Sequence, residues 1–347
     1  MSRPASSAPC PGVEVQARGA GPGSPGRRAV LASALLLAAC SRPAPEPAAP
    51  AAAPLPIVAT FTLLADMVAN IGGDRVAVRS LVGPDGDAHV FSPSPADAKT
   101  LAGAGLVVVN GMGFEGWIDR LIAASGYRGP VVVASEGIAA LPLESDAHGH
   151  AHSHGHAHAA GSGSSAPALD PHGWQSPAQA RRYVANILSA LVAADPSNAE
   201  YFRERARTYD AKIEALDRAA RERLGRIPEE RRRVITGHDA FGHLGAAYGI
   251  RFFSPRGVST GGEASARDVG RLIRQIREQR IRAVFVENIS DPRLVEQIAR
   301  ESGARVGGVL FSDALSAKDA RASTYLEMMR HNIETIASAL AEEPAAR

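Results

Sequence analysis

Cysteine is scarce in this sequence of 347 residues, which contains only Cys10 and Cys40. Both cysteines lie within the first 40 residues, so the rest of the chain has neither disulfides nor thiolate ligands for a metal ion. Any transition-metal site in the rest of the chain must therefore be built from His, Asp and Glu. The sequence has 11 histidines that could serve this purpose.

The short motifs of common hydrolases are also missing. The sequence has no H-E-x-x-H and no G-x-S-x-G, and no cysteine nucleophile follows residue 40. A zinc hydrolase would in addition need an open coordination position with a general base beside it. We therefore expect a protein that is not an enzyme.

A large net charge is absent once the N-terminal leader is set aside. Arg27 and Arg28 precede AVLASALLLAA, an apolar run of 11 residues that is too short to span a bilayer and is typical of an export signal. Without residues 1–39, the remaining 308 residues have a formal charge of −1 instead of +2. The basic character thus belongs to the leader, and nothing in the charge argues for nucleic-acid binding.

The end of the leader predicts a lipid anchor. Leu37–Cys40 resembles a bacterial lipobox, in which the cysteine is lipidated after cleavage. The alternative is an ordinary signal peptide with an incidental cysteine. We expect an exported protein in the periplasm or on the outer face of the cytoplasmic membrane, anchored at Cys40. The arginine pair is compatible with Sec or twin-arginine export, and the long polar lead before it leaves open a downstream start codon.

Strand and helix patterns alternate in two series. In the first series, β-branched runs at 57–61, 76–82, 106–110 and 131–135 alternate with amphipathic stretches at 62–71, 94–104 and 115–124. In the second series, runs at 233–237, 250–254, 283–288 and 304–311 alternate with helical patterns at about 241–248, 265–280, 292–303 and 322–341. Such alternation indicates parallel sheets covered on both faces. We predict an α/β fold of two lobes, each with a mostly parallel four-stranded sheet.

Two helices are predicted between these series, at 177–194 and 197–226. The second helix has one narrow apolar stripe with spacings of 3 or 4: Phe202, Ala206, Tyr209, Ile213, Leu216, Ala220 and Leu224. At about 1.5 Å per residue it spans roughly 45 Å, enough to cross both lobes. The predicted segments are an export signal at 1–39, a Pro/Ala-rich tether at 40–56, an N-terminal lobe at 57–196, a linking helix at 197–226 and a C-terminal lobe at 227–347.

The densest histidine pattern lies in a Gly/Ser/Ala-rich stretch at 146–165. Six histidines alternate there with Ala, Gly or Ser: His148, His150, His152, His154, His156 and His158. Neutral imidazole is a common ligand for Zn, Cu, Ni and Fe, and a purification tag would normally lie at a terminus. The stretch therefore indicates an auxiliary metal-binding loop, but its composition is unsuited to an ordered site.

An ordered site is predicted in the loops that follow strands, where open parallel sheets bind their ligands. His89 and His172 stand in such loops of the first lobe, and His238 and Asp313 stand in such loops of the second. Each residue alone has an ordinary interpretation, such as a surface histidine or a helix-capping aspartate. Together they predict a site of three imidazoles and one carboxylate, which suits Zn, with Mn or Fe as alternatives.

Three further features each have two interpretations. Glu287 ends a strand beside the predicted site and either orients a ligand imidazole or caps a helix. His243, five residues after His238, is expected on another helix face, in a supporting or structural role. GMGFEG at 111–116 matches the G-x-G-x-x-G dinucleotide fingerprint, but an exported protein meets little NAD, so we favour a tight turn.

The order of several motifs resembles one known family. GDAHVFSPSP, NGMGFEGW, DPHGW, GHDAF and FSDALS occur in the same order in the zinc/manganese solute-binding lipoproteins of ABC transporters (cluster A-I, TroA-like), and the resemblance covers nearly all of residues 55–340. It implies two βα lobes joined by one long rigid helix, with metal bound in the interlobe cleft by residues matching His89, His172, His238 and Asp313. The histidine at the third of these positions is typical of zinc-type members, whereas manganese binders often have glutamate there. His243 departs from the family pattern, which usually has Tyr.

The same resemblance implies the biochemical role. We expect a high-affinity, extracytoplasmic and monomeric binding protein that delivers Zn2+, or alternatively Mn2+, to an ABC permease and its ATPase. A permease-independent surface adhesin or zinc chaperone is a further alternative, and a zinc hydrolase is the least expected role.

Overall fold

The computed structural model describes residues 53–139, 141–142 and 169–341. These residues belong to one compact unit, residues 52–347. The predicted export signal with Cys40, most of the predicted tether and the His-rich loop at 146–165 lie outside the described residues. The boundaries of the predicted segments therefore stay predictions.

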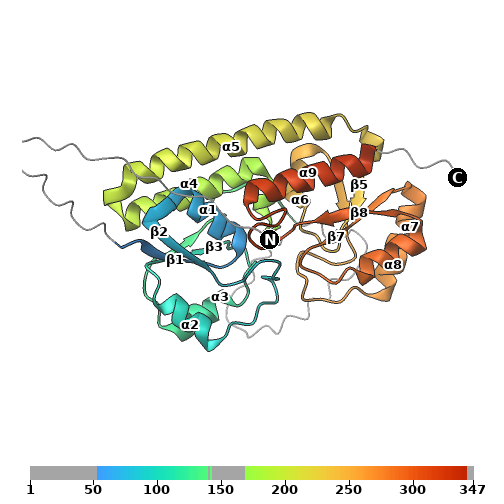
Figure 1. Cartoon of the computed structure of the whole chain (residues 1–347). Helices are drawn as coiled ribbons and strands as arrows, with labels where there is room; N and C mark the ends of the chain where they lie inside the picture. The colour runs from blue at the N-terminus through green and yellow to red at the C-terminus, as the bar shows by residue number, and fades with distance from the viewer. Residues whose placement is uncertain (1–52, 140, 143–168, 342–347) are drawn as a thin grey trace, which may run out of the picture. The chain divides into compact units, whose positions relative to one another are not determined.

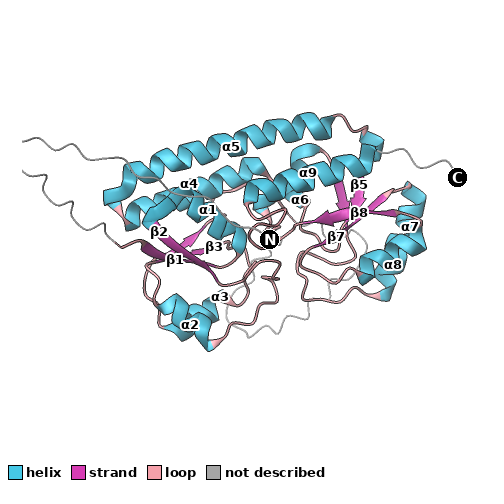
Figure 2. Cartoon of the chain, in the orientation of Figure 1, coloured by secondary structure: helices cyan, strands magenta, loops and turns pink. Residues whose placement is uncertain are grey.

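Two parallel four-stranded sheets form the framework, which confirms the predicted fold class (Figure 1, Figure 2). The strands of the first sheet, in the order β2-β1-β3-β4, are β1 (Leu55–Ala59), β2 (Val76–Ser80), β3 (Leu106–Val109) and β4 (Val131–Val133). The strands of the second, in the order β6-β5-β7-β8, are β5 (Arg233–Ile235), β6 (Arg251–Phe253), β7 (Ala283–Glu287) and β8 (Arg305–Leu310). All neighbours pair in parallel. The carboxyl ends of each sheet's strands thus share one edge, where the following loops gather.

Helices connect the strands: α1 (Thr62–Gly72), α2 (Pro95–Ala102), α3 (Ile118–Ser125), α4 (Pro177–Ala194), α5 (Ala199–Gly225), α6 (Gly242–Tyr248), α7 (Ala266–Gln279), α8 (Arg293–Ser302) and α9 (Tyr325–Ala341). Ser94 begins α2 with a capping box, and Pro177 is the first residue of α4. Helix α3 begins three residues later than predicted because the carboxylate of Glu115 is bound by the preceding turn. Among the described residues, no helix is both long and apolar enough to cross a bilayer.

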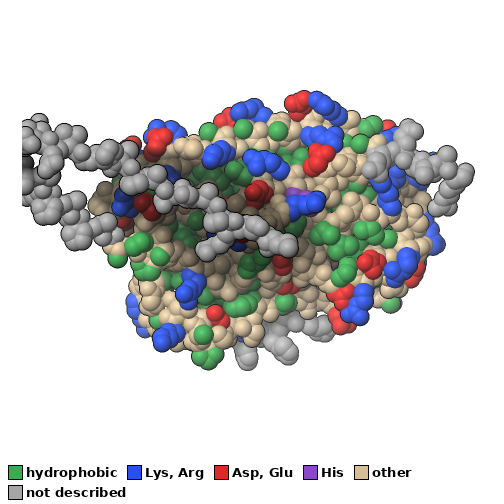
Figure 3. Space-filling model, in the orientation of Figure 1, with side chains coloured by type: hydrophobic (Ala, Val, Ile, Leu, Met, Phe, Trp, Pro, Cys, Tyr) green, Lys and Arg blue, Asp and Glu red, His purple; other side chains and the backbone are tan. Residues whose placement is uncertain are grey.

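The long helix α5 runs alongside elements of both lobes (Figure 1). Its buried residues are the seven of the predicted stripe. The helix packs against α1 and α4 of the N-terminal lobe and against α6 and α9 of the C-terminal lobe. The exposed face of α5 carries ion pairs such as Arg207–Glu204 at 2.7 Å. Figure 3 shows side chains of both charge signs interspersed on the viewed face of the molecule. Because exposed pairs contribute little to stability, the apolar stripe is what holds α5 to both lobes.

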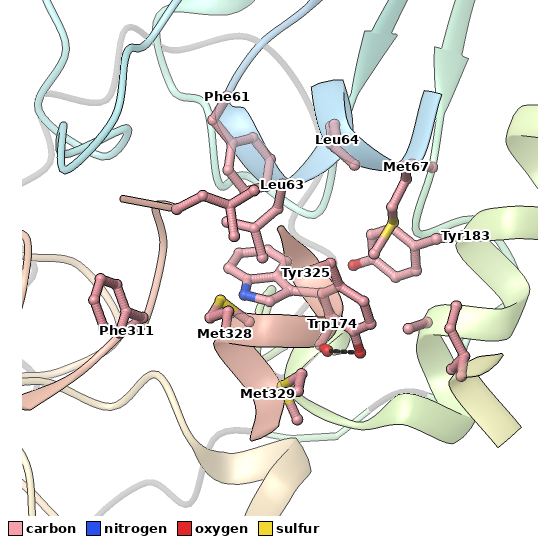
Figure 4. Close-up of a cluster of buried hydrophobic side chains, with 14 of the residues drawn as sticks. Phe61, Leu63, Leu64, Met67, Trp174, Tyr183, Phe311, Tyr325, Met328 and Met329 are labelled. Carbon is pink, nitrogen blue, oxygen red and sulfur yellow. Dashed lines mark hydrogen bonds between the residues drawn. The ribbon is translucent and has the colours of Figure 1, made fainter. Parts of the chain in front are cut away.

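One hydrophobic core extends beneath both sheets. It joins Phe61 of the N-terminal lobe to Phe285 of the second sheet and to Tyr325 and other residues of α9. A smaller cluster under α7 and α8 covers the opposite face of the second sheet. Trp174 is fully buried among residues of both lobes, and the hydroxyl of Tyr325 donates to its carbonyl oxygen at 2.8 Å (Figure 4). Since interiors are close-packed, any relative movement of the lobes must deform this shared core.

Asp66 is a partly buried carboxylate at the junction of α1, α5 and α9. It accepts the backbone N–H of Tyr325 at 3.0 Å and the hydroxyl of Tyr209 at 3.4 Å. Burial is the largest influence and raises the pKa of Asp66 to about 6, with a smaller contribution from the charge of Glu327. Because the pKa is raised in the folded state, the stabilising contribution is complete below the unfolded pKa and is lost as pH rises through about 6.

Replacing Asp66 by asparagine is expected to remove this dependence on pH. As pH rises from 4 to 8, the wild type should lose about 1–2 kcal/mol of stability relative to Asp66→Asn. This loss follows from the raised pKa of Asp66, and solvent screening limits its size. Urea unfolding of both metal-free proteins at several pH values measures the difference. If the free energies of unfolding of the two proteins changed with pH in the same way, the pKa of Asp66 would not differ between the folded and unfolded states.

Candidate metal centre

The four predicted ligands come from four loops, two in each lobe. His89 lies between β2 and α2, and His172 directly precedes a short 3-10 helix at Gly173–Gln175. His238 and Asp313 each stand three residues beyond the end of a strand, β5 and β8 respectively. The parallel strand order gathers such loops at the carboxyl edge of each sheet. The fold brings all four side chains together.

The four side chains enclose one small volume. Each offers a ligand atom, and these four atoms lie within 4.8 Å of one another. Nε2 of His89 is 3.3 Å from Nε2 of His172 and 3.2 Å from Oδ2 of Asp313. Nε2 of His238 is 3.1 Å from the same Oδ2. Nε2 of His172 is 3.6 Å from Oδ1 of Asp313. Three imidazole nitrogens and one carboxylate thus surround a common centre.

Almost no solvent reaches these groups. The side chain of His89 is 4% exposed, those of His172 and Asp313 are 0% exposed and that of His238 is 1% exposed. Among the described residues, Oδ1 of Asp313 has no hydrogen-bond partner. A buried carboxylate oxygen without a partner is costly unless a cation compensates it. The arrangement therefore favours a cation at its centre.

Carboxylates and imidazoles in the site influence one another's protonation. Burial alone would raise the pKa of Asp313, but the nearby His238 and His172 outweigh burial and hold that pKa well below its ordinary value. Burial also disfavours a charged imidazole, but Glu287 and Asp313 outweigh this effect and raise the pKa of His238 well above its ordinary value. A metal ion would replace the proton as the compensating charge, because ligand imidazoles bind metals in their neutral form.

Two buried carboxylates hold the outer nitrogens of two imidazoles. Oε2 of Glu287 is 2.5 Å from Nδ1 of His238, and its Oε1 accepts the backbone N–H of Gly237 at 2.6 Å. Oδ1 of Asp170 is 2.7 Å from Nδ1 of His172. A carboxylate on Nδ1 leaves Nε2 free to bind a metal ion. Glu287 was a candidate for this role from the sequence, whereas Asp170 was missed although DPHGW places it two residues before His172.

His243 lies one step farther from the centre. It is buried on α6, and its Nε2 is 3.2 Å from the backbone carbonyl oxygen of Asp170. The structure therefore places His243 behind the carboxylate residue that contacts His172. Its role in supporting the site stays a prediction.

The GMGFEG segment forms a turn next to the same centre. Gly111 and Gly113 have positive φ values of 88° and 77°, a region that favours glycine. Glu115 accepts the backbone N–H of Gly111 at 3.1 Å. The ring of Phe114 then lies edge-on to that of His89, with centroids 4.5 Å apart. The segment thus contributes an apolar wall to the candidate centre.

Replacing Glu287 by glutamine is expected to lower zinc affinity by about 10- to 100-fold, the usual effect of losing such a supporting carboxylate. The amide keeps the shape of the side chain but cannot provide a negative charge to Nδ1 of His238. Competition with a fluorescent zinc chelator measures the affinity. Glu278→Gln on the exposed face of α7 is the matched control. If Glu287→Gln bound zinc with unchanged affinity, the negative charge of Glu287 would not contribute to zinc binding.

Comparison with known proteins identifies the family. Residues 57–339 match the family described as zinc-uptake complex component A, periplasmic (ZnuA). The chain belongs to the ZnuA family. Proteins of the ZnuA family are solute-binding components of ABC transporters, so the chain is a binding protein and not an enzyme. This confirms the expectation drawn from the missing hydrolase motifs.

Relatives of the chain are named after different metals. The iron-binding protein YfeA of Yersinia pestis is 33% identical over 281 residues, which cover 81% of this chain and 85% of YfeA. The manganese-binding lipoprotein MntA of Bacillus subtilis is 32% identical over 291 residues, covering 82% of this chain and 90% of MntA. The structure of the periplasmic zinc binding protein TroA from Treponema pallidum matches with a TM-score of 0.74 and 30% identity, over 83% of this chain and 100% of TroA. These names agree on metal binding but not on one metal.

Proposed function

We propose that this protein captures Zn2+ outside the cytoplasm and delivers it to an ABC permease with its ATPase. The observation that carries the proposal is the buried set of three imidazoles and one carboxylate, contributed equally by the two lobes. His89, His172, His238 and Asp313 are the proposed ligands. With four protein ligands the coordination shell is closed, which suits carriage of the ion.

Zinc is proposed over manganese because the ligand set is rich in imidazole. Four ligands at about 2.0–2.1 Å from a tetrahedral zinc ion lie about 3.3 Å from one another. The separations of 3.3 Å between His89 and His172 and of 3.1 Å between His238 and Asp313 are close to this value, and the ligand atoms spread over up to 4.8 Å in all, so the spacing fits a small cation without selecting the metal. Imidazole-rich sets suit zinc, whereas manganese favours more oxygen ligands. A manganese-binding role is the alternative, and it is supported by a relative that is named for manganese binding.

Several features of the proposal come from the sequence alone. They are a lipid anchor at Cys40, location in the periplasm or on the outer face of the cytoplasmic membrane, a monomeric state, and a His-rich loop that raises the local metal concentration. A permease-independent adhesin or zinc chaperone would use the same site. Because α5 and the shared core link the lobes, we infer that closure around the ion is modest.

A competitive titration with Zn2+ and Mn2+ tests the function. The mature chain is compared with a variant lacking residues 147–160, so that the ordered site is separated from the His-rich loop. We expect one tight zinc equivalent in both proteins and excess weak binding only in the intact chain. A preference for manganese would change the metal but keep the transport role. The absence of any tight equivalent in the variant would overturn the proposed function.

A further inference from the structure

His89 is held differently from the other two imidazoles of the site. A carboxylate oxygen lies within ion-pair distance of Nδ1 in both His172 and His238, at 2.7 Å and 2.5 Å. Among the described residues, no carboxylate is within bonding distance of Nδ1 of His89, and its ring contacts Phe114. His89 is also the most exposed of the four side chains, at 4%. The position of this imidazole therefore depends mainly on the backbone that carries it.

That backbone is fixed by the carboxylate of Asp87. Oδ1 of Asp87 accepts the backbone N–H of His89 at 2.9 Å. Oδ2 accepts the hydroxyl of Thr260 at 2.5 Å. Thr260 lies between β6 and α7, in the C-terminal lobe, whereas Asp87 and His89 lie in the N-terminal lobe. One carboxylate thus connects the loop of His89 to the opposite lobe.

A second set of contacts holds the start of the same loop. Oδ1 of Asp85 accepts a hydrogen bond from Nδ2 of Asn288 at 2.8 Å, and the backbone N–H of Asp85 donates to the carbonyl of Leu315 at 3.0 Å. Asn288 directly follows β7, and Leu315 stands two residues after Asp313. The His89 loop is therefore connected to the loop that carries the proposed carboxylate ligand.

The segment around Thr260 also lies against the outer side of the His89 loop. A Cβ atom added to Gly261 would lie 3.4 Å from Cγ1 of Val90. Val90 is 54% exposed, so this side of the loop has little other cover. Movement of the His89 loop away from the centre would thus disturb its contact with the Thr260 segment.

We propose that the hydrogen bond between Asp87 and Thr260 is an interlobe latch that positions His89 and slows release of the bound metal ion. Neither residue contacts the ion; both act through the backbone of His89. The inference rests on the proposed function and deepens it, because it names the contact that controls how fast the ion leaves. A closed shell of four ligands releases its ion only when one ligand moves away. Among the three imidazoles, only that of His89 has no carboxylate next to its Nδ1 among the described residues, so we expect His89 to move first.

The test is the rate of zinc release from the full chain loaded with one equivalent of Zn2+ and mixed with excess EDTA. Thr260→Val removes the hydroxyl but keeps the shape of the side chain. We expect its slow release phase to be roughly tenfold faster than that of the wild type, the size expected for loss of one hydrogen bond to a charged group. Thr260→Ser, which restores the hydroxyl, should return the rate to near the wild-type value. Thr208→Val, on the exposed face of α5, is the matched control and should leave the rate unchanged.

A second readout distinguishes a latch from a damaged site. The absorption spectrum of the Co2+-loaded protein reports the ligand set, and it should be the same in Thr260→Val and in the wild type. A release rate within twofold of the wild type would overturn the latch while leaving the proposed function intact. An altered Co2+ spectrum in Thr260→Val would also overturn it, because the ligands themselves would have changed. A wild-type chain without a tight zinc equivalent would overturn the proposed function and this inference together.

Discussion

His238→Ala is expected to lower the affinity for Zn2+ by at least about a hundredfold. Structural zinc sites bind with an apparent free energy of roughly 10–16 kcal/mol, so one of four ligands contributes about 3 kcal/mol. The substitution removes Nε2, which lies 3.1 Å from Oδ2 of Asp313, and also leaves Glu287 without its imidazole partner. The loss of affinity comes from the missing ligand atom, whereas the unpaired buried carboxylate of Glu287 costs folding stability in the variant.

Chelator competition on the loop-deleted variant measures this affinity without interference from the His-rich stretch. His331→Ala serves as the control, because this half-buried histidine of α9 is not a proposed ligand: its Nε2 bonds to Val309 and Thr335, and its ring packs on Phe311. The control should bind zinc like the unsubstituted protein. If His238→Ala retained the full affinity, the proposed ligand set would be wrong even if zinc still bound tightly elsewhere.

Trp174→Ala is expected to give the largest loss of stability, about 3–5 kcal/mol, as for other large-to-small substitutions in cores. The indole is 0% exposed, and its Nε1 donates to the carbonyl of Ser312 at 2.9 Å. Its ring lies 5.1 Å from that of Phe61 and 4.9 Å from that of Phe114. Because Trp174 packs between elements of both lobes, its removal opens a cavity that neither lobe can close alone.

Thermal unfolding of the metal-free protein measures this effect, which should lower Tm by roughly 5–8 °C for a chain of this size. Trp174→Phe keeps most of the volume and loses only the indole hydrogen bond, so it should be less affected. A Tm for Trp174→Ala within two or three degrees of the wild type would show that the two lobes do not depend on this shared core.

Local sequence patterns predicted most of the fold and the four members of the candidate centre. The stripe from Phe202 to Leu224 is the buried face of α5, because a helix places residues three and four apart on one side. The strands were found because buried parallel strands need continuous apolar runs. His89, His172, His238 and Asp313 were predicted because open parallel sheets bind their ligands in the loops after such strands, and the fold brings these four side chains together.

Contacts between distant segments were decided by the tertiary structure alone. The bond from Thr260 to Asp87 spans 173 positions, and the contacts of Trp174 with Ser312 span 138, so no local pattern could pair these residues. Asp170 was missed because an aspartate before a proline is equally typical of a turn. The alternation of apolar and polar residues determines which face of each helix and strand is buried. Which buried faces and loops meet depends on packing all of them at once, and this packing places the ligands and the residues that hold them.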